Sequence, residues 1–119
     1  MKIHRGEIVL VDFPYSDQTG SKVRPALIVE ADVWNRALDD TILALISSSR
    51  RRRVGAATQY FIDVSTAEGQ QSGLRFDCVI QCENLITYDQ SLILRVLGSL
   101  SVSTMQKIDN CLKAALGIP

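Results

Sequence analysis

The stretch GSKVRPALIV, residues 20–29, decides the fold expected for this chain. A polar, glycine-bearing turn runs into Arg24 and Pro25, and four apolar residues follow directly. Pro25 fixes its own φ and pushes Arg24 into an extended conformation, so the pair begins a strand. Because residues 26–29 are apolar on both faces, the strand is expected inside a sheet. The same rigidity suits a second interpretation, in which Arg24 is held in place to meet an anion.

The composition is that of an ordinary globular protein, and residues 1–119 are expected to form one domain. Of the 119 residues, 46% are hydrophobic and 22% are charged, which is enough for a core without disulfides. Thirteen Lys and Arg residues balance thirteen Asp and Glu residues. A nucleic-acid partner must therefore be argued from a local patch of charge and not from the net charge.

The three cysteines, Cys78, Cys82 and Cys111, are expected to be small buried side chains. A metal site is the weaker alternative, because neither a histidine nor a third cysteine stands near the first two. An odd number of cysteines and the lack of a signal-like N-terminus indicate the reducing cytoplasm. The longest apolar run, ALIV at 26–29, is too short to cross a bilayer, so no membrane partner is expected.

A series of short strands closed by one helix is expected along the chain. Segments rich in β-branched residues, separated by turn residues, predict strands at 7–13, 24–31, 41–48, 59–64, 77–85 and 92–100. The polar connectors 32–40 and 65–75 have room for short helical turns. The fold class is therefore α+β and mainly β: a small, strongly bent antiparallel sheet or barrel with a C-terminal helix over one open side.

The helix is predicted by apolar residues at every third or fourth position near the C-terminus, namely Val102, Met105, Ile108, Leu112 and Leu116. Ser103 followed by Gln106 fits a capping box, and Ser101 is the competing N-cap. Gly117 can take the left-handed conformation that ends a helix, and Pro119 cannot continue one.

Two strand ends carry the side chains that suggest a function. Arg24 opens the second strand, and the third strand ends in SSSRRRR at 47–53. If these strands are neighbours, Arg24 and Ser47 can face each other across one surface. The four arginines Arg50 to Arg53 form a local positive patch that suits a phosphate backbone. The alternative is a solvated loop that protects a sheet edge.

The chain lacks the usual residues for nucleophilic or metal-dependent catalysis. Ser47 has no activating motif, and His4, the only histidine, is expected at the surface. Glycine-rich phosphate loops and clustered carboxylates are absent, so no cofactor or metal is expected. RNA supplies its own nucleophile, because its 2′-hydroxyl can attack the adjacent phosphate. A rigid Arg24 and a neighbouring hydroxyl suit the remaining task, which is to align the groups and stabilise charge on phosphorus.

Several motifs in the same order resemble the MazF/PemK toxins. They are RGEIVLVDF at 5–13, RPALIV at 24–29, DCVIQCENL at 77–85 and the helical tail at 101–116, and the match covers roughly residues 5–116. The resemblance implies a small SH3-like barrel of the CcdB/Kid/MazF type, assembled as a homodimer. It also implies a cytoplasmic toxin of a type II toxin–antitoxin system, with a cognate MazE-like antitoxin. The implied activity is metal-independent, sequence-specific cleavage of single-stranded RNA.

The resemblance also implies roles for individual residues. The arginine of the family's Arg-Pro falls on Arg24, and the hydroxyl at the end of the third strand, usually threonine, falls on Ser47. These two are the expected catalytic residues. Asn84 stands where relatives often carry glutamine, and Asp17 is the available acid where relatives often carry glutamate. The expected RNA-binding residues are Asp17, Lys22, Ser48, Arg50, Arg51, Arg52, Arg53 and Asn84.

Two other functions stay open at this point. One is a non-catalytic, CcdB-like toxin that binds DNA gyrase, because fold alone does not settle function. The other is an inactive or antitoxin-locked member of the family, because serine replaces threonine at Ser47. The pairing of Arg24 and Ser47 beside the arginine run favours the nuclease, since a gyrase binder has no need of it.

Overall fold

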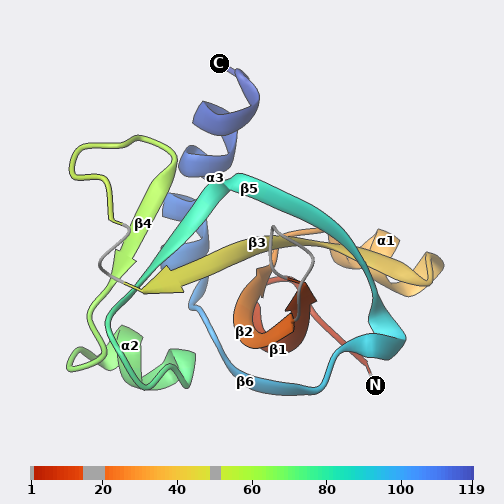
Figure 1. Cartoon of the computed structure of the whole chain (residues 1–119). Coiled ribbons are helices and arrows are strands. Elements are labelled where there is room, and N and C mark those ends of the chain that lie inside the picture. Colours follow the sequence, from red (N-terminus) through yellow and green to blue (C-terminus); the bar gives the residue numbers. More distant parts are fainter. Residues whose placement is uncertain (1, 15–20, 49–51) are drawn as a thin grey trace.

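Six antiparallel strands form one curled sheet in the computed structural model, which describes residues 2–14, 21–48 and 52–119 (Figure 1). The strand order across the sheet is β4-β5-β3-β2-β1-β6, and the sheet curls into a half-barrel. The strands are β1 (Glu7–Pro14), β2 (Ser21–Ile28), β3 (Asp40–Ser48), β4 (Gln59–Ile62), β5 (Cys78–Asp89) and β6 (Arg95–Ser99). This arrangement confirms the expected mainly β, barrel-like fold with a C-terminal helix.

Short helical elements occupy both polar connectors, as the sequence allowed. The helices are α1 (Asp32–Ala37), α2 (Ala67–Ser72) and α3 (Val102–Leu116), and a 3₁₀ turn, η2, spans Gln90–Leu92. Figure 1 shows α3 against β4 and β5, and α2 at the end of the half-barrel next to β6. Together the helices α2 and α3 cover the region between the two edge strands β4 and β6.

Three strands have boundaries that differ from the expected ones by three residues or more. β2 runs from Ser21 to Ile28 and not over 24–31, so the prediction that Arg24 opens this strand was wrong: the ladder with β1 already begins at Ser21. β5 continues to Asp89, four residues past the expected end, because its second half pairs along β3. β6 begins only at Arg95, because the preceding residues turn in η2, where the Asp89 carboxylate accepts the backbone N–H of Ser91 at 2.9 Å. The pairing partner and the capping side chain thus override local strand propensity.

A bulge of three residues bends β5 in its middle. Gln81 pairs with Leu45 of β3, but the next pair joins Leu85 to Ala44, so residues 82–84 have no opposite residue on β3. Such an insertion bends and twists the strand that carries it. The first half of β5 can therefore pair with both β3 and β4, whereas the second half pairs with β3 alone.

The core lies in two clusters on the two faces of the curled sheet. One contains Ile8, Leu27, Ile80 and Ile108, and α3 packs on it. The other is built on β1, β2 and β3 and includes Leu43. The three cysteines are free and buried, which confirms their expected role as small core side chains. Among the described helices, none is long and apolar enough to cross a membrane.

Helix α3 begins and ends close to the expected residues, but its cap is the other serine. The Ser101 side chain accepts the backbone N–H of Thr104 at 3.2 Å, so the capping box proposed at Ser103 was wrong. Gly117 ends the helix at φ 70°. The buried face contains Met105, Ile108 and Cys111, whereas the two ends of the expected stripe, Val102 and Leu116, are exposed.

A partly buried carboxylate ties α2 to the rest of the molecule. Glu68 of α2 accepts the Tyr60 hydroxyl of β4 at 2.8 Å, and it also accepts the hydroxyl of Thr104 from α3. Partial burial, together with this bond, raises the pKa of Tyr60 to about 12, so the phenol stays a donor. The bonds fix α2 at the end of the half-barrel, next to the strand ends that carry Arg24 and Ser47.

Candidate functional site

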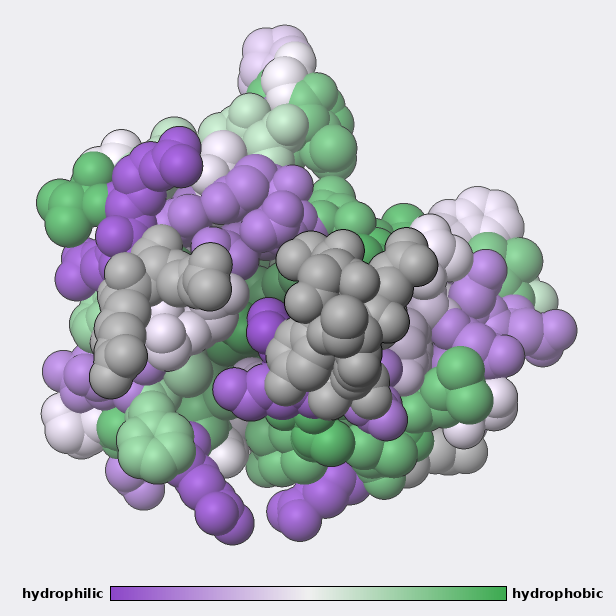
Figure 2. Space-filling view, viewed as in Figure 1, coloured by the Kyte–Doolittle hydropathy of each residue, from purple (hydrophilic) through white to green (hydrophobic). Residues whose placement is uncertain are grey.

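A cavity of about 730 Å³ opens at the end of the half-barrel, where β2 begins and β3 ends. Its described walls come from β1, β2, β3, β6 and the segment between α2 and β5. The lining includes the apolar residues Leu10, Ile46, Leu74 and Leu97. Figure 2 shows apolar surface next to hydrophilic residues on this face of the molecule. The cavity therefore combines an apolar floor with polar groups at the strand ends.

Arg24 and Ser47 both line this cavity. Ser47 comes from the end of β3, as expected, whereas Arg24 is the fourth residue of β2 and not its first. The β2–β3 register pairs Ala26 with Leu45. Two residues further along each strand, the same register sets Arg24 opposite Ser47, and opposite residues of an antiparallel pair share a face. Both residues are half-buried. The tertiary structure thus brings together the two residues expected to act together.

A buried glutamine that the sequence analysis missed orients Ser47. Ser47 Oγ donates to Gln81 Oε1 at 3.0 Å, and Asn84 Nδ2 donates to the same oxygen at 3.0 Å. Because the Ser47 proton is held by Gln81, the lone pairs of its Oγ are the part left for a ligand. Gln81 is the one polar residue in the buried run from Cys78 to Cys82, and that break in an apolar strand was the available signal.

Glu83 lies in the bulge of β5 and is held there by two side-chain hydrogen bonds. The Glu83 carboxylate accepts Thr58 Oγ1 at 2.9 Å and Gln59 Nε2 at 2.7 Å. Partial burial works against ionisation, but these hydrogen bonds and the nearby Arg53 guanidinium hold the pKa of Glu83 below its ordinary value. Glu83 is therefore an ionised structural anchor for the segment that carries Asn84.

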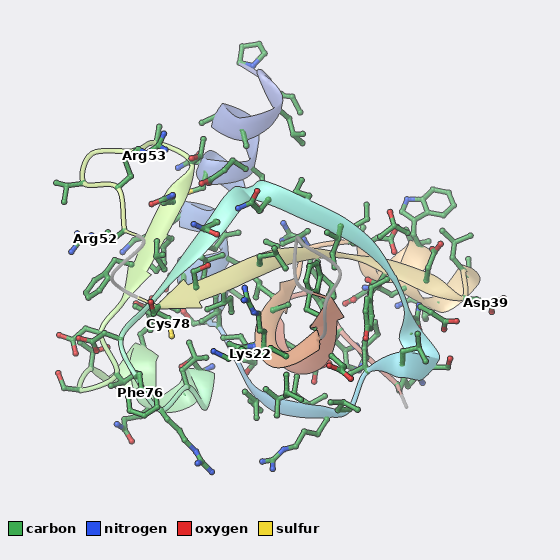
Figure 3. The ribbon with its side chains drawn as sticks, viewed as in Figure 1. Lys22, Asp39, Arg52, Arg53, Phe76 and Cys78 are labelled. Atoms are coloured by element: carbon green, nitrogen blue, oxygen red, sulfur yellow. The ribbon has the colours of Figure 1, made fainter. Side chains whose placement is uncertain are left out.

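The cavity wall is strongly cationic. Lys22, Arg24, Arg75 and Arg95 all line it, and its described lining residues include no carboxylate. Among the described residues, none of these four forms an ion pair. Figure 3 shows Lys22 on β2 and Cys78 at the start of β5, two of the residues around this opening. A wall of unpaired cations in a partly enclosed cavity attracts a polyanion.

The other residues expected to bind RNA divide into three groups. Lys22 and Ser48 line the cavity together with Arg24 and Ser47, and Asn84 is linked to Ser47 through Gln81. Arg52 and Arg53 are exposed but do not line the cavity: the Arg52 guanidinium lies 4.2 Å from the centre of the Phe61 ring, and the Arg53 backbone N–H donates to Gln59. The remaining three, Asp17, Arg50 and Arg51, lie outside the described residues.

The charged and aromatic lining residues that the sequence analysis did not propose for the site are Arg75, Phe76 and Arg95. Arg95 is the only charged residue in LILRVLGSL, and Phe76 is an aromatic residue between two charged ones, so each carried a weak signal. His4 is exposed and does not line the cavity, which confirms its assignment to the surface.

The family model that describes the PemK-like, MazF-like toxin of type II toxin–antitoxin systems matches residues 4–116. The chain is 24% identical to endoribonuclease MazF6 of Mycobacterium tuberculosis over 119 residues, which is 99% of this chain and 100% of that protein. It is 26% identical to endoribonuclease EndoA of Bacillus subtilis, over 99% of this chain and 97% of that protein.

Solved structures share the fold. A mycobacterial endoribonuclease in complex with its cognate antitoxin superimposes with a TM-score of 0.78 at 24% identity, covering 98% of this chain and 97% of the other. A MazE–MazF structure from Deinococcus radiodurans gives a TM-score of 0.73 at 17% identity, with all of both chains covered. Because the family model covers nearly the whole sequence, this chain belongs to the PemK-like, MazF-like toxins of type II toxin–antitoxin systems.

Proposed function

We propose that this protein is an endoribonuclease toxin that cuts single-stranded RNA without a metal ion. The observation that carries the proposal is the cavity in which Arg24 and Ser47 meet, with four cations and no carboxylate among its described lining residues. The curated relatives named above are endoribonucleases, which supports a nuclease over the gyrase-binding alternative. The catalytic roles of the two residues remain part of the proposal.

The geometry suits a reaction in which RNA provides its own nucleophile. The 2′-oxygen forms a bond to phosphorus, the bond from phosphorus to the 5′-oxygen breaks, and one proton is transferred in net from the 2′-hydroxyl to the leaving oxygen. The Arg24 guanidinium offers preorganised donors to the charge that develops on the phosphoryl oxygens. Ser47, whose proton is donated to Gln81, presents acceptor lone pairs that suit the 2′-hydroxyl as a donor, and so helps to align the nucleophile.

The RNA strand is proposed to extend from the cavity over the neighbouring loops. Lys22 and Ser48 would hold the phosphates next to the scissile bond, and Asn84 would contact a base. The arginine run Arg50 to Arg53, together with Asp17, would act further along the RNA strand. Exposed guanidiniums at Arg52 and Arg53 support this placement.

The arginine run supplies a test of phosphate contact that is independent of cleavage. Replacing Arg50 to Arg53 by glutamine is expected to weaken RNA binding for all sequences. It should also flatten the plot of log K against log salt by about 0.7 for each lost contact, which is the single-strand value. The measurement is fluorescence anisotropy of a 2′-O-methyl oligonucleotide across a salt series, with the exposed Arg36→Gln as the matched control. An unchanged slope in the fourfold variant would identify the run as a solvated loop.

We also propose that the protein acts in the cytoplasm as a homodimer and is neutralised by a MazE-like antitoxin. The antitoxin-bound mycobacterial endoribonuclease and the MazE–MazF structure from Deinococcus radiodurans support the antitoxin partner. Three free, buried cysteines suit a reducing compartment. An acidic antitoxin segment would meet the same cations that RNA phosphates meet, so the two should compete.

Removal of metal ions tests the proposed chemistry directly. Purified protein is expected to cut a labelled single-stranded RNA in EDTA at the rate seen with added Mg²⁺, because no step calls on a metal. The products should carry a 5′-hydroxyl and a cyclic phosphate. Loss of cleavage in EDTA that returns with Mg²⁺ would contradict the mechanism. Growth arrest without any RNA cleavage would favour the gyrase-binding alternative instead.

A further inference from the structure

Phe76 is an aromatic side chain that the proposed chemistry does not use. Its ring is 76% exposed, yet it lines the wall of the cavity that holds Arg24 and Ser47. A single exposed apolar residue is common on protein surfaces and carries no argument by its exposure alone. Two features of its surroundings point to a ligand. The ring belongs to a segment that is held by hydrogen bonds, and cationic side chains line the same cavity.

The segment between α2 and β5 is held at both ends. The buried Ser72 hydroxyl accepts the backbone N–H of Leu74 at 3.1 Å, and Cys78 Sγ donates to the Phe76 carbonyl at 3.0 Å. One residue further on, the Asp77 carboxylate accepts the backbone N–H of Val64 at 3.0 Å. A ring on such a segment loses little freedom when a ligand covers it, which favours binding.

Arginines flank the ring on the same wall. Arg75 is the neighbouring residue, and Arg95 of β6 reaches the cavity through the sheet register. Arg95 pairs with Leu10 of β1, and Leu10 pairs with Pro25, so these three residues form one row across β6, β1 and β2. Arg24, the residue before Pro25, points to the other face of β2, but it lines the same cavity. The ring and the catalytic pair therefore share a cavity whose described charges are all positive.

We propose that Phe76 is the stacking platform for one nucleobase of single-stranded RNA, and that Arg75 and Arg95 hold the phosphates on either side of that nucleotide. The subsite rests on the proposed function and adds a binding step to it. Unpaired bases stack on exposed aromatic rings, and guanidiniums bind phosphate oxygens in a bidentate manner. In Figure 3 Phe76 lies at the start of β5 near Cys78, with Lys22 of β2 also at the opening.

An RNA strand fits these groups better than a protein segment does. Once a phosphodiester is seated between Arg24 and Ser47, the base of a nucleotide next to it must lie somewhere along the cavity wall. The open ring of Phe76 is the flat apolar surface that this wall offers, and the flanking cations match the charge repeat of a nucleic-acid backbone. Every base has a π-face, so the contact adds affinity without fixing the base identity.

Binding of an uncleavable RNA tests the platform. The probe is a 2′-O-methyl single-stranded oligonucleotide that carries the cleavage site mapped from 5′ ends after induction. Phe76→Ala should weaken its binding roughly 5- to 100-fold, the range measured when one stacked base loses its aromatic partner. Phe76→Trp should retain binding, because an indole also stacks. The matched control is Trp34→Ala, which removes another exposed aromatic residue, on α1 and away from the cavity.

An abasic scan identifies the base and separates stacking from a general loss of structure. One abasic position in the oligonucleotide should weaken binding to the wild-type protein by the same factor as Phe76→Ala, and should have no further effect on the variant. Every other abasic position should act on both proteins equally. This pattern would support the platform, because a merely unfolded or distorted variant is not sensitive to one base.

Three outcomes would overturn the inference, and they differ from a failure of the proposed function. The first is equal binding by wild type and Phe76→Ala, in preparations that both cleave RNA. The second is a loss in the variant that no single abasic position reproduces. The third is weaker binding of the antitoxin with unchanged binding of RNA, which would assign the ring to the protein partner. A wild-type protein that neither binds nor cuts RNA would instead contradict the proposed function itself.

Discussion

Replacing Arg24 by alanine is expected to lower the rate of RNA cleavage roughly 100- to 1,000-fold, as does the loss of one preorganised donor to a developing negative charge. The effect should fall on the rate of the chemical step, because the charge on the phosphoryl group grows only in the transition state. Single-turnover cleavage of a labelled RNA, with the enzyme in excess, measures this step. Arg36→Ala, which removes an exposed arginine of α1, is the matched control and should cleave at the wild-type rate.

Ser47 variants sharpen the same experiment. Ser47→Ala should lose less activity than Arg24→Ala, because it removes an aligning hydroxyl and leaves the main charge donor in place. Ser47→Thr should be tolerated, since the oxygen that donates to Gln81 is retained. Full activity in a folded Arg24→Ala protein, as judged by an unchanged circular dichroism spectrum, would remove Arg24 from the catalytic site.

Replacing Gly73 by alanine is expected to cost on the order of 3 kcal/mol of unfolding free energy, from backbone strain and overpacking together. Gly73 ends α2 with φ 75°, a left-handed conformation that alanine adopts with strain. A Cβ at this position would also lie nearer than 3.0 Å to the backbone of Leu97 in β6, so β6 or the end of α2 would have to move. Urea denaturation monitored by circular dichroism measures the loss.

Gly55→Ala separates the two causes. Gly55 has a similar φ of 80°, but a Cβ there would meet nothing within 4 Å. This variant should therefore lose only about 1 kcal/mol, the cost of the left-handed conformation by itself. Equal losses in the two variants would show that α2 and β6 do not pack closely at Gly73. Because Gly73 precedes Arg75 and Phe76, its variant should also weaken RNA binding at temperatures where it stays folded.

Much of the site was readable along the chain, because local rules govern it. Pro25 restricts its own φ and the conformation of Arg24, so an extended segment with a rigid arginine follows from two adjacent residues. The start of the strand does not follow from them, because pairing with β1 extends β2 back to Ser21. Ser47 at the end of the third strand and the arginine run that follows it can also be recognised from adjacent residues alone. The pairing of Arg24 with Ser47 needed one further assumption, that their strands are neighbours, and the register of β2 with β3 supports it.

The helix cap shows where local rules stop being sufficient. Ser101 and Ser103 are both good N-caps, and the sequence favoured the second because Gln106 completes a capping box. The structure uses Ser101, whose side chain accepts the backbone N–H of Thr104, and Thr104 lies in the first turn with its hydroxyl donating to Glu68 of α2. Packing thus chose between two caps whose local energies are similar.

The existence of the six strands and the C-terminal helix, and the two residues proposed to carry the chemistry, could be read from the chain, because each depends on residues close in sequence. The exact bounds of β2, β5 and β6, and the side chains around the two residues, depend on tertiary contacts. Gln81 reaches Ser47 from a strand 34 residues further along, at a register set by the bulge of β5. Phe76 and Arg95 join the cavity because α2 packs on β6. Such contacts depend on strand order and close packing across the whole fold, and no local preference encodes them.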